Sequence, residues 1–192
     1  MHANDVERND LPGIDVLDNA DVLLLSVRRR VLPEAQFNSV QKFLQSGKPV
    51  VGIRTANHAF SLRGKDPPSG LFAWKNFDAE IFGGSYTNHY GAGPQVTLKQ
   101  VQPHPILTGV DVETFKGMGS LYQVNPLATT TTPLLTGTID GKPEETIAWI
   151  NKTKFGGKAF YTSLGHVDDF AQPAMNRLLK NAIYWAVDQE IQ

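Results

Sequence analysis

The chain has 192 residues, of which 41% are hydrophobic and 19% are charged, a composition that excludes a disordered protein. The formal net charge of -1 gives no broad positive surface, so we expect neither nucleic acid nor a membrane as a partner. The absence of cysteine excludes disulfides, thiolate zinc sites and a cysteine nucleophile. The length suits one domain over residues 1–192.

The hydrophobic runs are all shorter than the roughly 18 residues that a membrane-spanning helix needs. Residues 1–10 are polar and lack the apolar stretch of a signal peptide. We therefore expect a soluble protein that is cytoplasmic by default, or secreted if a signal peptide has been removed. Residues 1–13 are polar throughout, and we expect them to form a flexible N-terminal segment.

The first part of the chain predicts a strand–helix–strand unit. Residues 21–27 form a short continuous apolar run, which is typical of a strand buried on both faces. Pro33 opens an expected helix to about Ser46, and Gly47 is its end signal. Residues 48–54 suit a second buried strand, so these two strands should be parallel.

The remaining elements continue the alternation of strands and helices. We expect a helix start at 55–60, a strand or helix end at 78–81 and a half-exposed strand at 96–101. Further strands are expected within 115–138, at 146–150 and at 158–163, the last two joined as a hairpin. Pro173 opens the last helix, whose apolar residues recur at helical spacing. These residues are Met175, Leu178, Leu179, Ala182, Ile183 and Ala186.

Histidines stand near the ends of the predicted strands, where open α/β sheets bind ligands. His166 is the first candidate for an acid–base catalyst because histidine exchanges a proton near neutral pH. His58 and His89 could assist it, and Asp168 follows His166 closely in the chain. A hydrogen-bonded structural role is the alternative for each histidine, and it is strongest for His104, which stands between two prolines.

Other polar and aromatic side chains suit substrate binding. Residues 28–30 are three arginines at a strand end, where they could hold a phosphate or carboxylate or form a solvated loop. Tyr86 and Tyr122 could stack on a sugar ring or belong to the core. No HxH or HExxH spacing supports a metal site, so we expect no cofactor. A divalent metal held by His and Asp side chains is the alternative.

Several short motifs follow one another in a characteristic order over about residues 14–188. They are Gly83-Gly84, His89, His104-Pro105-Ile106 with Gly109, Leu121-Tyr122, Trp149 before Gly156-Gly157, Phe160 to His166, and Leu178 to Ala186. Their order and spacing resemble the ThuA-like (trehalose utilisation) domains of the class I glutamine amidotransferase-like superfamily. The resemblance implies a flavodoxin-like, doubly wound, mostly parallel sheet with helices on both faces.

The resemblance also implies two departures from the family. Amidotransferases place a cysteine at a turn after a strand, and residues 52–56 resemble this turn with Arg54 at the cysteine position. Arginine stays protonated and cannot attack a carbonyl, so glutamine hydrolysis by that route is excluded. Relatives usually have an earlier strand and helix than the one at 21–27. Without them one sheet edge is open, which favours a homodimer.

We therefore expect a hydrolase-type enzyme that applies acid–base chemistry to a carbohydrate or another small polar molecule. A non-catalytic ligand-binding or assembly domain that has kept the cleft is the alternative. The expected catalytic residues are His166, His58 and His89. The expected substrate-binding residues are Arg54, Asn57, Tyr86, Tyr122 and Asp168.

Overall fold

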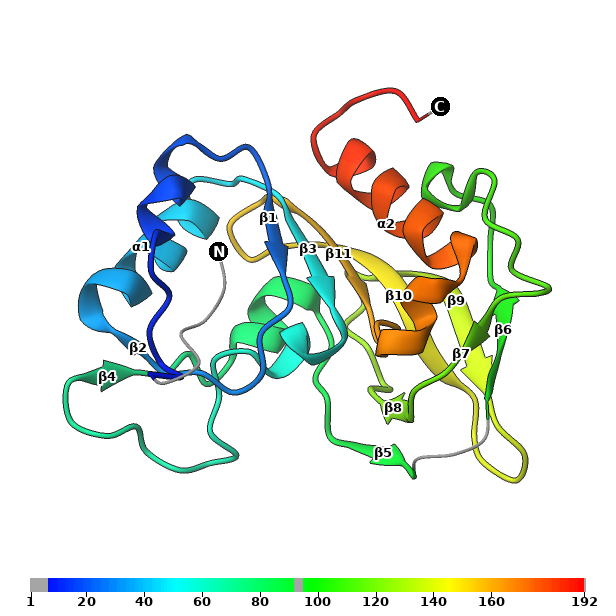
Figure 1. Cartoon of the computed structure of the whole chain (residues 1–192), viewed down its shortest axis with the longest axis horizontal. Helices are drawn as coiled ribbons and strands as arrows, with labels where there is room; N and C mark the ends of the chain where they lie inside the picture. Colours follow the sequence, from blue (N-terminus) through cyan, green and yellow to red (C-terminus); the bar gives the residue numbers. More distant parts are fainter. Residues whose placement is uncertain (1–6, 92–94, 192) are drawn as a thin grey trace.

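A computed structural model describes residues 7–91 and 95–191 (Figure 1). The strands are β1 (Leu23–Leu25), β2 (Leu32–Pro33), β3 (Val50–Ile53), β4 (Leu71–Phe72), β5 (Asn88–Tyr90), β6 (Val96–Gln100), β7 (Lys116–Gly117), β8 (Leu121–Gln123), β9 (Thr132–Thr138), β10 (Glu145–Lys152) and β11 (Lys158–Thr162). The helices are α1 (Glu34–Gln45) and α2 (Pro173–Ala186), with short helical turns η1 (Ile14–Asn19), η2 (Arg54–His58), η3 (Asp78–Phe82), η4 (Pro105–Leu107) and η5 (Val167–Ala171).

Seven strands form the central sheet, in the order β1-β3-β11-β10-β9-β6-β7. The pairings of β3 with β1 and β11 are parallel, whereas the other four pairings are antiparallel. Strands β1, β3, β11, β9 and β7 still run in one direction, and only β10 and β6 oppose them. The α/β class and the mostly parallel strand direction are confirmed. Parallel pairing is narrower than the sequence predicted because hairpin-joined strands must pair antiparallel.

The predicted strand–helix–strand unit is confirmed as β1, α1 and β3, with β1 and β3 parallel. Helix α1 begins after Pro33 and buries Val40, Phe43 and Leu44, whose spacing places them on one face. The chain leaves the helix through Gly47, at a φ of 77° that glycine adopts without steric strain.

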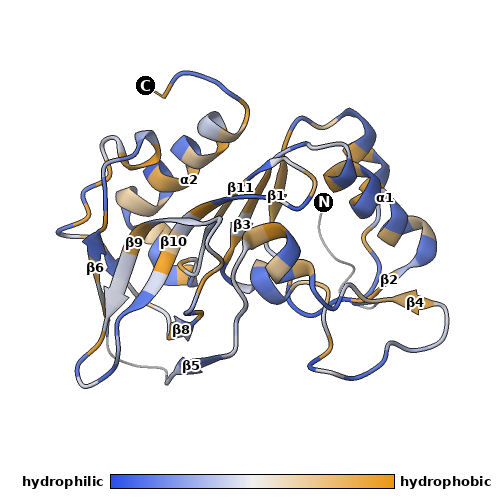
Figure 2. Ribbon diagram, turned by 180° about the vertical axis from the view of Figure 1, so that it is seen from behind, coloured by the Kyte–Doolittle hydropathy of each residue, from blue (hydrophilic) through white to orange (hydrophobic). Residues whose placement is uncertain are grey.

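Two hydrophobic layers enclose the sheet, because successive strand residues point to opposite faces. Val50 packs in the layer that contains α1, and Val51 packs in the layer that contains α2. Figure 2 shows each helix with a hydrophobic and a hydrophilic side. Helices on both faces are therefore confirmed. Helix α2 begins at Pro173 as predicted, and only Ile183 of its predicted apolar stripe is not fully buried.

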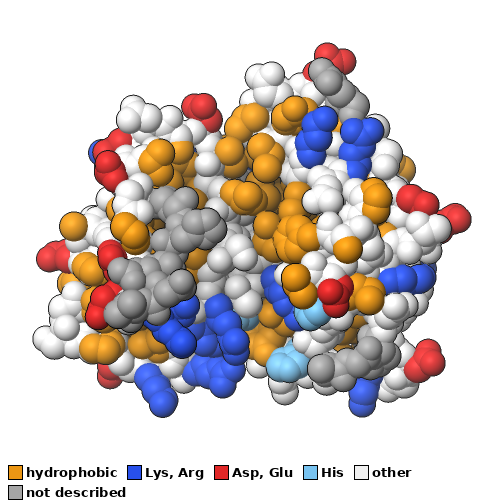
Figure 3. Space-filling model, in the orientation of Figure 1, with side chains coloured by type: hydrophobic (Ala, Val, Ile, Leu, Met, Phe, Trp, Pro, Cys, Tyr) orange, Lys and Arg blue, Asp and Glu red, His pale blue; other side chains and the backbone are white. Residues whose placement is uncertain are grey.

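Within the described ranges, β1 lies at an open edge of the sheet, as the sequence analysis expected. Leu24 on this strand is 49% exposed. Figure 3 shows hydrophobic side chains across the middle of one face, over the strands between α1 and α2. No helix in the described part of the chain has the length and hydrophobicity to cross a membrane.

Part of the segment expected to be flexible is packed on the domain instead. Residues 1–6 lie outside the described residues. Leu11 is buried, and its N–H donates to Gln36 Oε1 on α1 at 2.9 Å. Gln36 Nε2 in turn donates to Asp10 Oδ1 at 2.6 Å. The polar composition concealed this because one leucine and a side-chain amide are enough to dock the segment.

Candidate functional site

The three parallel strands end at one edge of the sheet, and a loop leaves each of them there. Strand β1 leads to residues 28–30, β3 leads to η2, and β11 leads to residues 163–166. The first two loops are joined because the N–H of Arg29 donates to the carbonyl of His58 at 3.2 Å. This edge is where open α/β sheets place their ligands.

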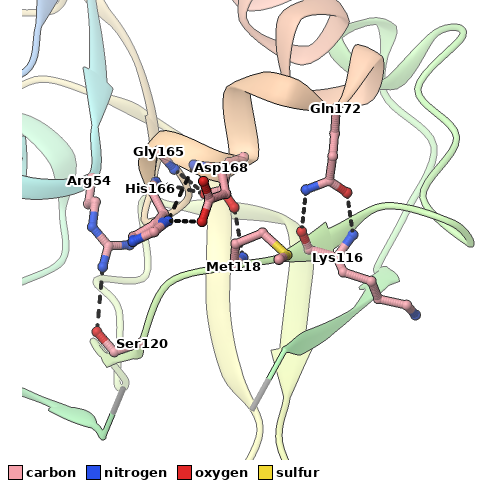
Figure 4. A network of polar contacts seen from close by, with 9 residues as sticks. Arg54, Lys116, Met118, Ser120, Gly165, His166, Asp168 and Gln172 are labelled. Atoms are coloured by element: carbon pink, nitrogen blue, oxygen red, sulfur yellow. Dashed lines mark hydrogen bonds and ion pairs between the residues drawn. The ribbon is translucent and has the colours of Figure 1, made fainter. Parts of the chain in front are cut away.

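Arg54 occupies the sharp turn after β3 and has a left-handed backbone, with a φ of 48°. Its Nη1 donates to the Ser163 carbonyl at 3.2 Å, and its Nη2 donates to Ser120 Oγ at 3.5 Å (Figure 4). The guanidinium also lies 5.0 Å from the centroid of the Tyr122 ring. A Cβ at Gly119 would overlap Nη1. Only about 10 Å³ of free space remains here, so the guanidinium is packed against protein.

His166 caps η5, the short turn after β11. Its Nδ1 accepts from the N–H of Asp168 at 3.3 Å and lies 3.4 Å from Asp168 Oδ2. A ring nitrogen that accepts carries no proton, so the neutral ring carries its proton on Nε2. The predicted pair of His166 and Asp168 is therefore adjacent in space, and its contacts organise the turn itself.

Asp169 holds this turn in place, a role that the sequence analysis did not assign. Its carboxylate is fully buried. Oδ2 accepts from the N–H groups of Gly165 at 2.6 Å and His166 at 2.8 Å, and Oδ1 accepts from that of Met118 at 2.7 Å. Figure 4 shows these bonds drawing the η5 turn onto the segment before β8. The available signal was its capping-box spacing, three residues after His166.

Four residues proposed separately from the sequence form one aromatic cluster. Strand β5 pairs with β8 so that His89 lies opposite Tyr122. The Tyr86 ring lies 4.6 Å from the His58 ring and 4.6 Å from the Tyr122 ring. Tyr86 Oη and His89 Nδ1 are hydrogen-bonded at 2.6 Å. Residues from η2, β5 and β8 thus meet at one place.

This cluster forms a wall of a polar cavity of about 680 Å³. That volume lies within the roughly 300–1,000 Å³ typical of small-molecule sites. Its lining residues are Arg29, His58, Ser61, Arg63, Asp78, Tyr86, Thr87, Asn88 and His89. Figure 3 shows Lys and Arg side chains beside histidines on this face of the molecule.

A family profile described as ThuA, trehalose utilisation, matches residues 2–186. The chain belongs to the ThuA family. No curated protein matches it. Among solved structures it is similar to a ThuA-like protein from Parabacteroides merdae, at 16% identity and a TM-score of 0.60 over 92% of this chain and 74% of that one.

Two further solved structures resemble this ThuA-family chain. A cytoplasmic protein from Salmonella typhimurium is 15% identical, with a TM-score of 0.61 over 92% of this chain and 76% of that one. A GMP synthase chain from Thermoplasma acidophilum is 16% identical, with a TM-score of 0.55 over 93% and 81%. At these identities the likeness shows the fold alone.

His58 is held neutral in the cavity of this ThuA-family chain. The side chain is buried, and desolvation together with the nearby arginines, Arg29 foremost, lowers its pKa to about 3. Asn57 Oδ1 lies 3.0 Å from its Nδ1, so Nδ1 carries the proton and Nε2 can accept. Asn57 is itself fully buried and supports the ring from below the cavity. His58 therefore suits a hydrogen-bond acceptor for a substrate hydroxyl, because at this pKa it carries no extra proton near neutral pH.

The predicted site residues thus divide into two groups. His58, Tyr86 and His89 line the polar cavity, and Tyr122, Asn57 and Arg54 pack directly behind them. His166 and Asp168 are not in that lining. Within residues 7–91 and 95–191, no three His, Asp or Glu side chains are grouped to hold a metal ion.

The sequence analysis missed two members of the lining. Arg63 lies in a surface loop, and Asp78 begins the helical turn η3. Neither stands at the end of a predicted strand, so no local pattern marked it. Arg29 was considered only as one of three arginines at a strand end.

Proposed function

We propose that this ThuA-family chain is a carbohydrate-related enzyme that works by acid–base chemistry in the polar cavity beside η2. The observation that carries the proposal is the 2.6 Å hydrogen bond between Tyr86 Oη and His89 Nδ1 in the cavity wall. A hydroxyl held by a histidine can pass a proton to a substrate and recover it. The family's description as trehalose utilisation supports a sugar as the substrate.

The proposed hydrolytic step uses both nitrogens of the His89 ring. The Tyr86 hydroxyl gives its proton to the leaving glycosidic oxygen as the carbon–oxygen bond breaks. His89 Nδ1–H returns a proton to Tyr86 Oη, and His89 Nε2 takes one from the attacking water, whose oxygen bonds to the sugar carbon. The pair ends neutral, with the histidine in its other tautomer. His89 is exposed, so water can reach its ring.

The other residues of the site position this pair and the substrate. His58 Nε2 accepts a sugar hydroxyl, since its Nδ1 is engaged by Asn57. Arg54 fixes Tyr122, and Tyr122 packs edge-on against Tyr86. We assign no proton transfer to His166, because it lies outside the cavity lining and caps η5.

A ligand-binding domain without turnover is the second candidate. The packing of Arg54 at the family's turn after β3 favours it, because that position holds no nucleophile and little free space. Such a domain would keep the 680 Å³ cavity and bind the sugar there. Turnover, and its dependence on Tyr86, separates the two candidates.

The test is the release of reducing sugar from trehalose and a panel of neutral and anionic glycosides. Tyr86→Phe should lower kcat by about 10²- to 10⁴-fold, the usual range for losing a general acid. Tyr90→Phe is the matched control, since it removes a hydroxyl from the same strand outside the cavity lining. Full activity in Tyr86→Phe would refute the assignment. Sugar binding without turnover in the wild type would establish the binding domain.

A further inference from the structure

Two arginines from different loops face the same polar cavity. Arg29 follows β1, and Arg63 lies in the loop after η2. Both have a left-handed backbone, with φ values of 50° and 52°. This conformation is costly for a residue with a Cβ and persists where the surrounding structure imposes it. The backbone is therefore held so that two guanidinium groups approach one space.

These arginines lack acidic partners within the protein. Among the described residues, neither Arg29 nor Arg63 forms a salt bridge. Arg29 Nη1 reaches only the Ser61 carbonyl, at the long distance of 3.5 Å. Its Nε is buried and has no hydrogen-bond partner among the described atoms. A buried cationic donor without a partner is costly, so a ligand atom would stabilise it.

The other titratable groups of the cavity do not cancel this positive charge. His58 is neutral, as described above. Asp78 is the one carboxyl group in the lining, and burial raises its pKa. Its Oδ1 already accepts the N–H of Ala79 at 2.9 Å. Because the whole chain has a net charge of -1, the excess of positive charge is a local property of the cavity.

We propose that the sugar bound in this cavity is anionic, with a carboxylate or a phosphate held between Arg29 and Arg63. The guanidinium fork matches both groups geometrically, and paired forks give directional binding that a lysine does not. The sugar ring would then lie toward Tyr86, His89 and His58. This inference rests on the proposed function, which places a sugar in the cavity, and it adds the substrate class.

The test is isothermal titration of the full chain with glucose, glucuronate, glucose 6-phosphate and inorganic phosphate. At least one anionic sugar should bind about tenfold to a hundredfold more tightly than glucose, the range expected for charge-assisted hydrogen bonds. Tighter binding of glucuronate identifies a carboxylate, and tighter binding of glucose 6-phosphate identifies a phosphate. Equal binding of glucose and both anionic sugars, no binding of any sugar, or inorganic phosphate binding as tightly as glucose 6-phosphate would overturn the proposal.

Variants locate the anion. Arg63→Gln should remove most of the preference, and because Arg63 is exposed this substitution should leave the fold intact. Arg29→Lys keeps the charge and loses the fork, so it should retain only part of the preference. Lys65→Gln, from the same exposed loop and outside the lining, is the matched control and should bind like the wild type. A preference that survives Arg63→Gln and Arg29→Lys unchanged would also overturn the proposal.

Tyr86→Phe separates this inference from the proposed function. It should lose turnover and keep the preference for an anionic sugar. Turnover that depends on Tyr86 without any anionic preference would contradict only the inference. An anionic preference without turnover in the wild type would contradict only the enzymatic function.

Discussion

The neutral, buried His58 should make the stability of the domain depend on pH. Its pKa is about 3 in the folded chain, against an ordinary value of 6.5. Between these values the unfolded chain binds a proton that the folded chain does not. The stabilisation is therefore fully present above pH 6.5 and is lost as the pH falls from 6.5 toward 3. Acidification should weaken the fold well before the carboxyl groups titrate.

The expected magnitude follows from the width of this window. Each unit of pKa difference corresponds to about 1.36 kcal/mol. Lowering the pH from 7 to 5 enters the window by about 1.5 units, so His58 should cost about 2 kcal/mol of unfolding free energy. That is a large share of the roughly 5–15 kcal/mol that stabilises a typical domain.

Urea unfolding at pH 7 and pH 5 measures this, with tryptophan fluorescence as the signal. Trp149 is fully buried and reports on the core. His58→Gln removes the titration, so its loss of stability between the two pH values should be about 2 kcal/mol smaller than that of the wild type. His104, whose pKa burial also lowers, and Asp78, whose pKa burial raises, are present in both proteins and cancel. The same pH dependence in both proteins would refute the reasoning.

Three further substitutions test the packing and the open edge. Gly119→Ala should destabilise the domain by about 1–3 kcal/mol in urea unfolding, because its Cβ overlaps the guanidinium beside it, whereas Gly91→Ala enters open space and should be neutral. Asp169→Asn should cost about 1–3 kcal/mol by thermal or urea unfolding, because an amide cannot accept all three N–H groups, whereas the exposed Asp168→Asn should change stability by under about 0.5 kcal/mol. Equal effects of the two aspartate substitutions would refute the role of the buried carboxylate. Sedimentation velocity should show a homodimer through the edge of β1 that Leu24→Lys dissociates, and a wild-type monomer at all concentrations would contradict this expectation.

The local elements were predictable because their signals lie within a few residues. Pro33 and Gly47 bound α1, and Pro173 with a helical apolar stripe marks α2. The parallel pairing of β1 with β3 follows from the helix between them. The order of the remaining strands depends on contacts between distant segments, so periodicity alone could not give it.

The candidate site shows the same division. His58 stands just after a predicted strand, so its place at the sheet edge could be expected. Its contact with His89 and Tyr122 depends on β5, a short and largely exposed strand that has no apolar alternation. The register of β5 with β8 then sets His89 opposite Tyr122. Arg63 enters the cavity from a loop whose course only the folded chain defines.

The direction of side chains was the other feature that the sequence could not supply. Arg54 stands at the expected turn, yet its guanidinium points to Ser163 and Ser120 because Gly119 leaves room for it. His166 stands at the expected strand end, yet its Nδ1 is used to cap η5. Sequence position indicates the edge of the sheet at which a residue lies, and packing decides what it faces.

The most direct test of the central claim is a titration of the histidine ring signals by NMR. Glucuronate or glucose 6-phosphate is added to the full chain, and the signals are assigned by single substitutions. A ligand in the polar cavity should shift the ring signals of His58 and His89 and leave those of His104 and His166 in place. Shifts at His166 with none at His58 and His89 would contradict the account and place the ligand at the end of β11.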